Sequence, residues 1–269
     1  MDQPIAILDS GVGGLTVVKE VMRQLPLEKI IYFGDTLRAP YGPRPAQEVI
    51  MFTRQIVDYL LMFEPKMIVV ACNTATAVAL DDIRLRTDIP VVGVIQPGAR
   101  AAIKRSRKGM IGVIGTEGTI NSGAYEHALK RIAPHLQVYS KACPEFVTLV
   151  EQGLYRSPAC EPIVARSLQD FRQLDIDCLI LGCTHYPFMA EKISDFLGPD
   201  VELISSAEET AREISTILHH RGQLASTLQM PMHQFFCSGD PVMFQKIARE
   251  WLDEEIHVSS VVWQMSRFA

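Results

Sequence analysis

The chain has 269 residues, of which 48% are apolar and 21% are charged, and this composition excludes a disordered or fibrous protein. Its length allows one large α/β domain or two smaller domains that share an interface. The net charge of −5 argues against nucleic-acid binding, and no apolar run approaches the ~20 residues of a membrane-spanning helix, so we expect neither partner.

Short apolar runs alternate with helical patterns almost throughout the chain. This alternation predicts βαβ units, and therefore an α/β fold with mainly parallel sheets. The expected strands, in chain order, are 4–8, 30–34, 67–71, 91–95, 110–114, 136–140, 178–182, 201–204, 233–237 and 256–262.

Three helices have clear sequence signals. Apolar residues spaced at about 3.6 positions predict one helix over 15–25 and another within 45–65, each ending before a proline. A third helix is expected to begin at Ser206, because Ser206 and Glu209 have the spacing of a capping box. This helix should end near Gly222.

The chain also contains an internal repeat. The runs IAILDSGVGG at 5–14 and IGVIGTEGT at 111–119 both predict a strand followed by a turn of small residues. A second pair follows at similar separations, IVVACNTAT at 68–76 and LILGCTHYP at 179–187. We therefore expect two related α/β halves, each with a cysteine at the carboxyl end of a strand.

Those two cysteines are Cys72 and Cys183. Ligands bind at such strand ends, where helix N-termini favour a thiolate. A single buried cysteine is more often inert packing, but both of these precede hydrogen-bonding residues at equivalent points of the repeat. We interpret them as paired acid/base groups. One thiolate would remove a proton from carbon while the opposite thiol supplies one to the other face, giving the mirror image.

The remaining cysteines are Cys143, Cys160, Cys178 and Cys237, which lack this pattern and are expected to be packing residues. None of the six has the spacing of a zinc site, so no metal is expected. The N-terminus lacks the basic start of an export signal. We therefore expect reduced thiols and a cytoplasmic protein.

Four motifs fall in one order along the chain: LDSGVGGLTV at 8–17, APYG at 39–42, ACNTAT at 71–76 and LGCTHYP at 181–187. Together they resemble the glutamate racemases, members of the cofactor-independent aspartate/glutamate racemase superfamily. The resemblance implies interconversion of L- and D-glutamate without a cofactor, which supplies D-glutamate for peptidoglycan synthesis. It also implies that Cys72 acts on D-glutamate and Cys183 on L-glutamate, and that the protein forms a homodimer.

The resemblance implies further site residues. Asp9 and His185 would assist the two cysteines and contact the substrate, although local patterns explain Asp9 equally well as a turn cap and His185 as a loop hydrogen-bonding residue. Glu151 could be a further charged group near the site, but a glutamate on a helix is usually solvent-facing, so we leave it outside the expected site. The other implied substrate-binding residues are Ser10, Tyr41, Gly42, Asn73, Thr74, Thr184 and, as a weaker counterpart of Ser10, Thr116.

The same resemblance implies two pseudo-symmetric, doubly wound α/β domains with the active site in the cleft between them. The Cys72 side would be discontinuous, formed by residues 1–96 and 208–269, and residues 97–207 would form the Cys183 side.

Other functions remain open. A sister enzyme would act on aspartate or another small acid, and a decarboxylase would use one thiol, although the paired cysteines disfavour it. A two-lobed module that only binds an amino acid or anion would tolerate the loss of both thiols.

Overall fold

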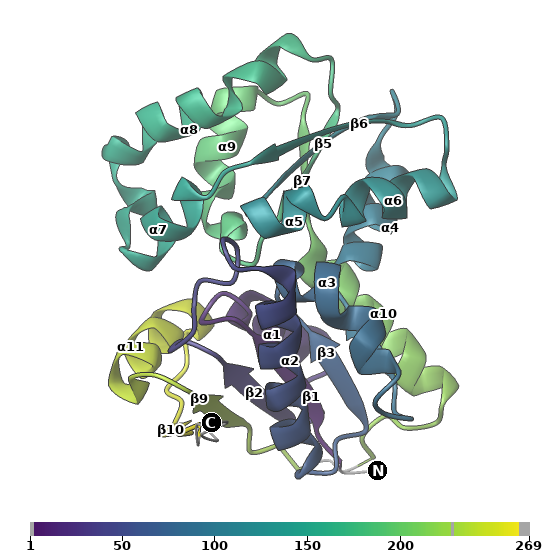
Figure 1. The fold of residues 1–269 in the computed structure, drawn as a ribbon, viewed down its shortest axis with the longest axis vertical. Helices are drawn as coiled ribbons and strands as arrows, with labels where there is room; N and C mark the ends of the chain where they lie inside the picture. Colours follow the sequence, from purple (N-terminus) through teal and green to yellow (C-terminus); the bar gives the residue numbers. More distant parts are fainter. Residues whose placement is uncertain (1–2, 227–228, 264–269) are drawn as a thin grey trace.

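The computed structural model describes residues 3–226 and 229–263, which form two parallel sheets with helices between successive strands (Figure 1). The strands of the first sheet are β1 (Ile5–Asp9), β2 (Ile30–Gly34), β3 (Met67–Val70), β4 (Val91–Gly93), β9 (Gln234–Cys237) and β10 (Val258–Ser260). Those of the second are β5 (Met110–Gly115), β6 (Gln137–Ala142), β7 (Cys178–Gly182) and β8 (Glu202–Ser205).

The helices occupy the connections between strands. In the first half they are α1 (Leu15–Gln24), α2 (Ala46–Leu61) and α3 (Asn73–Arg84). The next are α4 (Ile95–Arg105), α5 (Glu117–Asn121), α6 (Ala124–Ile132), α7 (Glu145–Glu151), α8 (Glu161–Leu168) and α9 (Ala190–Leu197). The last are α10 (Ser206–His220) and α11 (Pro241–Leu252). None of these helices combines the length and the apolarity that crossing a bilayer requires.

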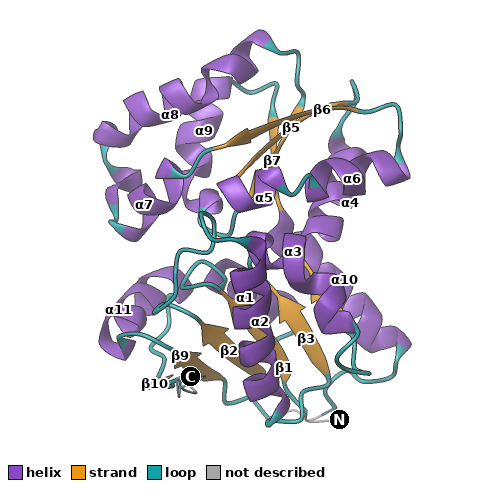
Figure 2. Ribbon diagram, viewed as in Figure 1, coloured by secondary structure: helices purple, strands orange, loops and turns teal. Residues whose placement is uncertain are grey.

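Both sheets are covered by helices on both faces. Along β1, Ile5 and Ile7 pack in the same apolar cluster as α1, α10 and α11, whereas Ala6 and Leu8 pack with α2 and α3. This period of two is what a strand buried on both faces requires. In the second sheet, α7, α8 and α9 lie on one side and α4 and α6 on the other (Figure 2). The predicted doubly wound α/β fold is thereby confirmed.

The two halves share a strand order. The first sheet contains the series β2-β1-β3-β4, and the second sheet is β6-β5-β7-β8. Strands β1 and β5 are therefore equivalent, as are β3 and β7, which precede Cys72 and Cys183. Since all pairs are parallel, the carboxyl ends of equivalent strands open toward the same edge of each sheet.

The chain passes between the halves through α4 and α10, which pack against each other. The predicted boundaries, 96/97 and 207/208, fall in the first turns of these two helices. The placement of the domain boundaries themselves stays a prediction.

Two local predictions need correction. The N-cap of α10 is Ser205 rather than Ser206, the cap that the predicted capping box requires. The Ser205 hydroxyl accepts a hydrogen bond from the Ala207 N–H at 3.4 Å, and Ser206 is the first residue of the helix. The strand expected over 91–95 ends at Gly93, because Val94 is the N-cap of α4 and Ile95 begins this helix, whose first turn accommodates Pro97.

We expect Ser205→Ala to lower the free energy of unfolding by about 1 kcal/mol, because the first turn of α10 loses its cap. Urea denaturation measures this change. Ser215→Ala, in the middle of the same helix, is the matched control and should be neutral or slightly stabilising, since alanine is the better helix former. Equal losses from both variants would contradict the assignment of the cap.

Candidate active site

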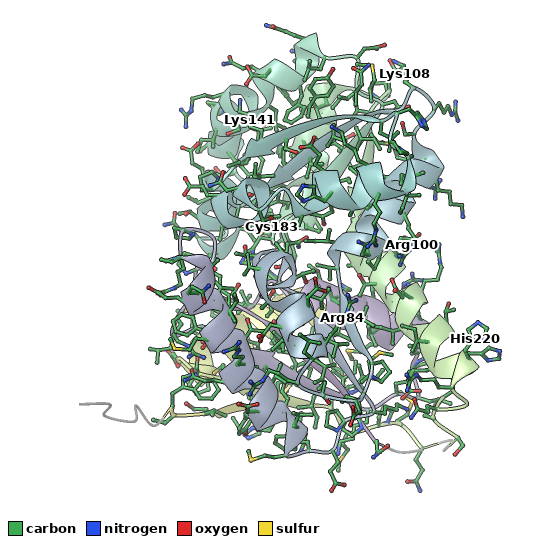
Figure 3. The ribbon with its side chains drawn as sticks, turned by 45° about the vertical axis from the view of Figure 1, so that its right-hand side comes forward. Arg84, Arg100, Lys108, Lys141, Cys183 and His220 are labelled. Atoms are coloured by element: carbon green, nitrogen blue, oxygen red, sulfur yellow. The ribbon has the colours of Figure 1, made fainter. Side chains whose placement is uncertain are left out.

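A pocket lies between the two halves, where the loops after β1, β3 and β7 meet. Cys183 lies at this junction, between the upper and lower parts of the molecule (Figure 3). Every predicted site residue except Asp9 lines the pocket. The structure thus brings together Ser10, Tyr41, Gly42, Cys72, Asn73, Thr74, Thr116, Cys183, Thr184 and His185.

Cys72 is the N-cap of α3. Its Sγ accepts a hydrogen bond from the Ala75 N–H at 3.5 Å and lies 3.6 Å from Ser10 Oγ. Burial raises the pKa of Cys72 to about 12, and the nearby charge of Asp9 adds to this, while the Ala75 and Ser10 contacts oppose it. The sequence led us to expect a helix N-terminus to favour the thiolate, but here burial outweighs that effect, so Cys72 holds its proton at neutral pH.

Cys183 has a different environment. It is followed by a short 3₁₀ turn over Tyr186–Met189 rather than by an α-helix. Its Sγ lies 3.8 Å from His185 Nδ1, and His185 Nε2 lies 3.2 Å from Glu151 Oε1. Burial opposes the charged imidazole, yet the Cys183 and Glu151 contacts outweigh it and raise the pKa of His185 to about 10. A positive charge therefore stands beside the Cys183 sulfur.

Glu151 is exposed, as expected for a solvent-facing helix residue, since 42% of its side chain is accessible. It also ends α7, lines the pocket and pairs with His185. No local motif surrounds it, and 34 residues separate it from its partner, so only the tertiary fold identifies it.

Asp9 lies beneath the pocket rather than in its wall. Its carboxylate is fully buried and accepts hydrogen bonds from the Gly11 N–H at 3.0 Å and from the Thr184 hydroxyl at 3.5 Å. Burial raises the pKa of Asp9 above its usual 3.8, and the positive charge of His185 partly offsets this. Asp9 is thus a turn cap, as its local sequence allows, and also a contact between the halves.

Other contacts join the halves around the pocket. The hydroxyls of Thr74 and Thr116 lie 2.8 Å apart, and the Gly118 N–H donates to Gly42 O at 2.8 Å. A Cβ on Gly42 would come within 2.8 Å of the Thr116 side chain. A Cβ on Gly13 would lie only 2.3 Å from Thr184 Oγ1. Glycine at these two positions therefore allows the halves to approach each other.

Two pocket residues have side chains that form hydrogen bonds with residues outside the pocket lining. The hydroxyl of Tyr41 donates to the buried carboxylate of Asp35, and its ring packs on Phe52, so this hydroxyl is already engaged away from the pocket. Asn73 Oδ1 accepts from the Tyr125 hydroxyl at 2.7 Å, and Asn73 Nδ2 finds no hydrogen-bond partner within the part of the chain that the structure describes. A buried donor of this kind is costly unless a ligand satisfies it.

The six cysteines are all buried and free. Cys143, Cys160, Cys178 and Cys237 lie outside the pocket lining. Within residues 3–226 and 229–263, no group of three His, Cys, Asp or Glu side chains is arranged to hold a metal ion.

The chain is similar to known racemases over nearly its whole length. Residues 14–214 match the family model "Asp/Glu/Hydantoin racemase". A glutamate racemase from Exiguobacterium sibiricum is 50% identical over 262 residues, 97% of each chain. The crystal structure of a Bacillus anthracis glutamate racemase isoform has a TM-score of 0.94 at 51% identity, with 96% of this chain and 97% of that one covered. A Francisella tularensis glutamate racemase, solved in complex with D-glutamate, has a TM-score of 0.91 at 36% identity, with 97% of each chain covered.

The chain therefore belongs to the Asp/Glu/hydantoin racemase family and is an isomerase. Within that family it belongs to the glutamate racemases, because half of its residues are identical to theirs over almost the full length. The resemblance seen in the four sequence motifs is confirmed.

We expect His185 to titrate near pH 10 and its pKa to fall in Glu151→Gln, because the variant loses the negative partner. The stabilisation from the raised pKa should be complete below about pH 6.5 and lost as the pH rises through about 10. NMR titration of the imidazole signals measures this pKa.

His233 is the internal control, because burial lowers its pKa below 6.5 and it lies outside the pocket lining. Its titration should be the same in both proteins. An unchanged His185 pKa in Glu151→Gln would contradict the role assigned to the Glu151 contact.

Proposed function

We propose that this protein interconverts L- and D-glutamate by moving the α-proton between two thiols, without a cofactor. In the L-to-D direction, the Cys183 thiolate removes the α-proton from one face, and the Cys72 thiol donates its proton to the opposite face. The reverse direction exchanges these roles, so each turnover removes one proton and returns one. The observation that carries the proposal is that both cysteines line one pocket from equivalent strand ends of the two halves.

The electrostatics of the two sulfurs support this assignment. The raised pKa of Cys72 keeps its thiol protonated, which suits a proton donor. The charged imidazole of His185 stabilises a negative sulfur on Cys183, which suits a base. Both sulfurs are at least nine-tenths buried, so little water competes for the proton.

The polar groups of the pocket support an amino diacid as substrate. Asn73 Nδ2 and the Ser10 hydroxyl supply donors for carboxylates, and Thr184, whose hydroxyl donates to Asp9, lies beside them in the pocket lining. The Francisella tularensis relative was solved with D-glutamate, which supports glutamate as the substrate here. Tyr41, Gly42, Thr74 and Thr116 complete the proposed substrate site from the loop before α2, from α3 and from the cap of α5.

Two acidic residues have supporting roles in this proposal. Asp9 acts from beneath the pocket by raising the pKa of Cys72 and by holding Thr184. Glu151 keeps His185 charged beside Cys183. Asp9 is thus placed to tune the thiol rather than to contact the substrate ammonium.

The wider role of the protein is also a proposal. D-glutamate would supply peptidoglycan synthesis in the cytoplasm, and the six free cysteines are consistent with a reducing compartment. The homodimer rests on the sequence resemblance. So does the division into residues 1–96 with 208–269 and residues 97–207, which is consistent with the strands of the two sheets.

The first experiment incubates the purified protein with L-glutamate in D₂O, without added cofactor. We expect the optical rotation to decay to zero while the α-proton signal disappears from the NMR spectrum, because each inversion delivers a solvent-derived deuteron. Exchange without racemisation would contradict the two-thiol mechanism. Turnover of L-aspartate alone would favour the sister enzyme, loss of CO₂ the decarboxylase, and binding without either change the binding module.

Replacing either pocket cysteine by serine should reduce racemisation by at least about 10²-fold, because a hydroxyl is a poor base and general acid–base catalysis contributes about 10²–10⁴-fold. Cys183→Ser should lose α-proton exchange of L-glutamate, and Cys72→Ser that of D-glutamate. Polarimetry and NMR measure the two rates. Cys160→Ala, outside the pocket, is the control and should retain wild-type activity. Full racemisation by either serine variant would refute the mechanism.

A further inference from the structure

The amide of Asn73 has two ends with different surroundings. Asn73 begins α3 and is only 2% exposed, and it lines the pocket. Its oxygen accepts from Tyr125 at 2.7 Å, while its nitrogen has no partner among the described residues. A primary amide turned by 180° exchanges a donor for an acceptor. What holds this amide therefore decides whether the pocket offers an N–H or a carbonyl oxygen to a carboxylate.

We propose that Tyr125 is a positioning residue for the racemase reaction: its hydroxyl holds the Asn73 amide with the nitrogen free to donate to a substrate carboxylate. This inference rests on the proposed function and adds a residue outside the pocket to it. Tyr125 is 2% exposed and is absent from the pocket lining, so it acts through Asn73 rather than by touching substrate.

The Tyr125 hydroxyl is suited to act as a donor. Burial raises the pKa of Tyr125 above its usual 10, so the hydroxyl keeps its proton at every pH at which the enzyme would work. Tyr125 Oη also lies close to α4, one of the two helices through which the chain passes between the halves. A Cβ built on Gly98 of α4 would be 3.4 Å from this oxygen. The same Cβ would be 3.1 Å from Ser206 Cβ, at the start of α10.

The hydrogen bond between Tyr125 and Asn73 joins the two halves. Tyr125 belongs to α6, which packs on the second sheet, whereas Asn73 belongs to α3 of the first half. The hydrogen bond therefore forms only when the halves stand in the arrangement seen here. The orientation of the Asn73 amide therefore depends on the contact between the halves.

A double-mutant cycle tests the proposal. Tyr125→Phe removes only the hydroxyl, and we expect the KM for glutamate to rise about tenfold while kcat changes much less, because a hydrogen bond to a charged group is weakened. Asn73→Ala should raise the KM at least as much. In the Asn73→Ala background, Tyr125→Phe should add less than about twofold, because its effect passes through the missing amide.

Calorimetric titration with D-glutamate provides a readout that needs no turnover, and the dissociation constants should follow the same pattern. Tyr155→Phe is the matched control, because Tyr155 is also a buried tyrosine of the second half, hydrogen-bonded to Glu250 at 3.2 Å outside the pocket. This control should match the wild type in both measurements.

Additive effects of Tyr125→Phe and Asn73→Ala, or an unchanged KM in Tyr125→Phe, would overturn the inference and leave the proposed function intact. A fall in kcat and thermal stability without a change in KM would also overturn it, because it would assign Tyr125 a purely structural role. Failure of the wild-type protein to bind or racemise glutamate would instead refute the proposed function and this inference with it.

Discussion

The pocket depends on the close approach of two strand-end loops that belong to different sheets. Thr184 reaches across to Asp9, and the Gly118 N–H bonds to Gly42 O. Gly13 and Gly42 make this approach possible, since a Cβ at either position would collide with the opposite half. Because each half contributes one cysteine, neither half contains a complete site. The chemistry belongs to the interface rather than to either sheet.

The two halves are related in strand order, but the surroundings of their two pocket cysteines differ in electrostatics. Burial and Asp9 raise the pKa of Cys72, whereas Cys183 stands beside a protonated His185 held by Glu151. A pair of identical sulfurs would begin each turnover in the same protonation state. The charged imidazole lies beside one sulfur only, and the proposed two-thiol mechanism requires such a difference between its acid and its base.

Several residues that shape the pocket stand behind its wall. Asp35 fixes the hydroxyl of Tyr41, Asp9 fixes Thr184, and Tyr125 fixes the amide of Asn73. Each is buried and each holds a polar side chain that would otherwise turn. Preorganised donors of this kind stabilise charge without having to reorient during the reaction. In the proposed site, the residues that would recognise the substrate are thus held by side chains that do not line the pocket.

The sequence by itself determined the alternation of strands and helices, the repeat of two halves and ten of the residues that line the pocket, because apolar periodicity and motifs at strand ends are local signals. Local signals misplaced the cap of α10, which is Ser205, and the end of β4, which is Gly93. Only the tertiary structure identified Glu151 and Tyr125, whose partners lie 34 and 52 residues away, and only it showed that burial raises the pKa of Cys72 despite its helix cap. Desolvation and long-range pairing arise from packing, which no local pattern records.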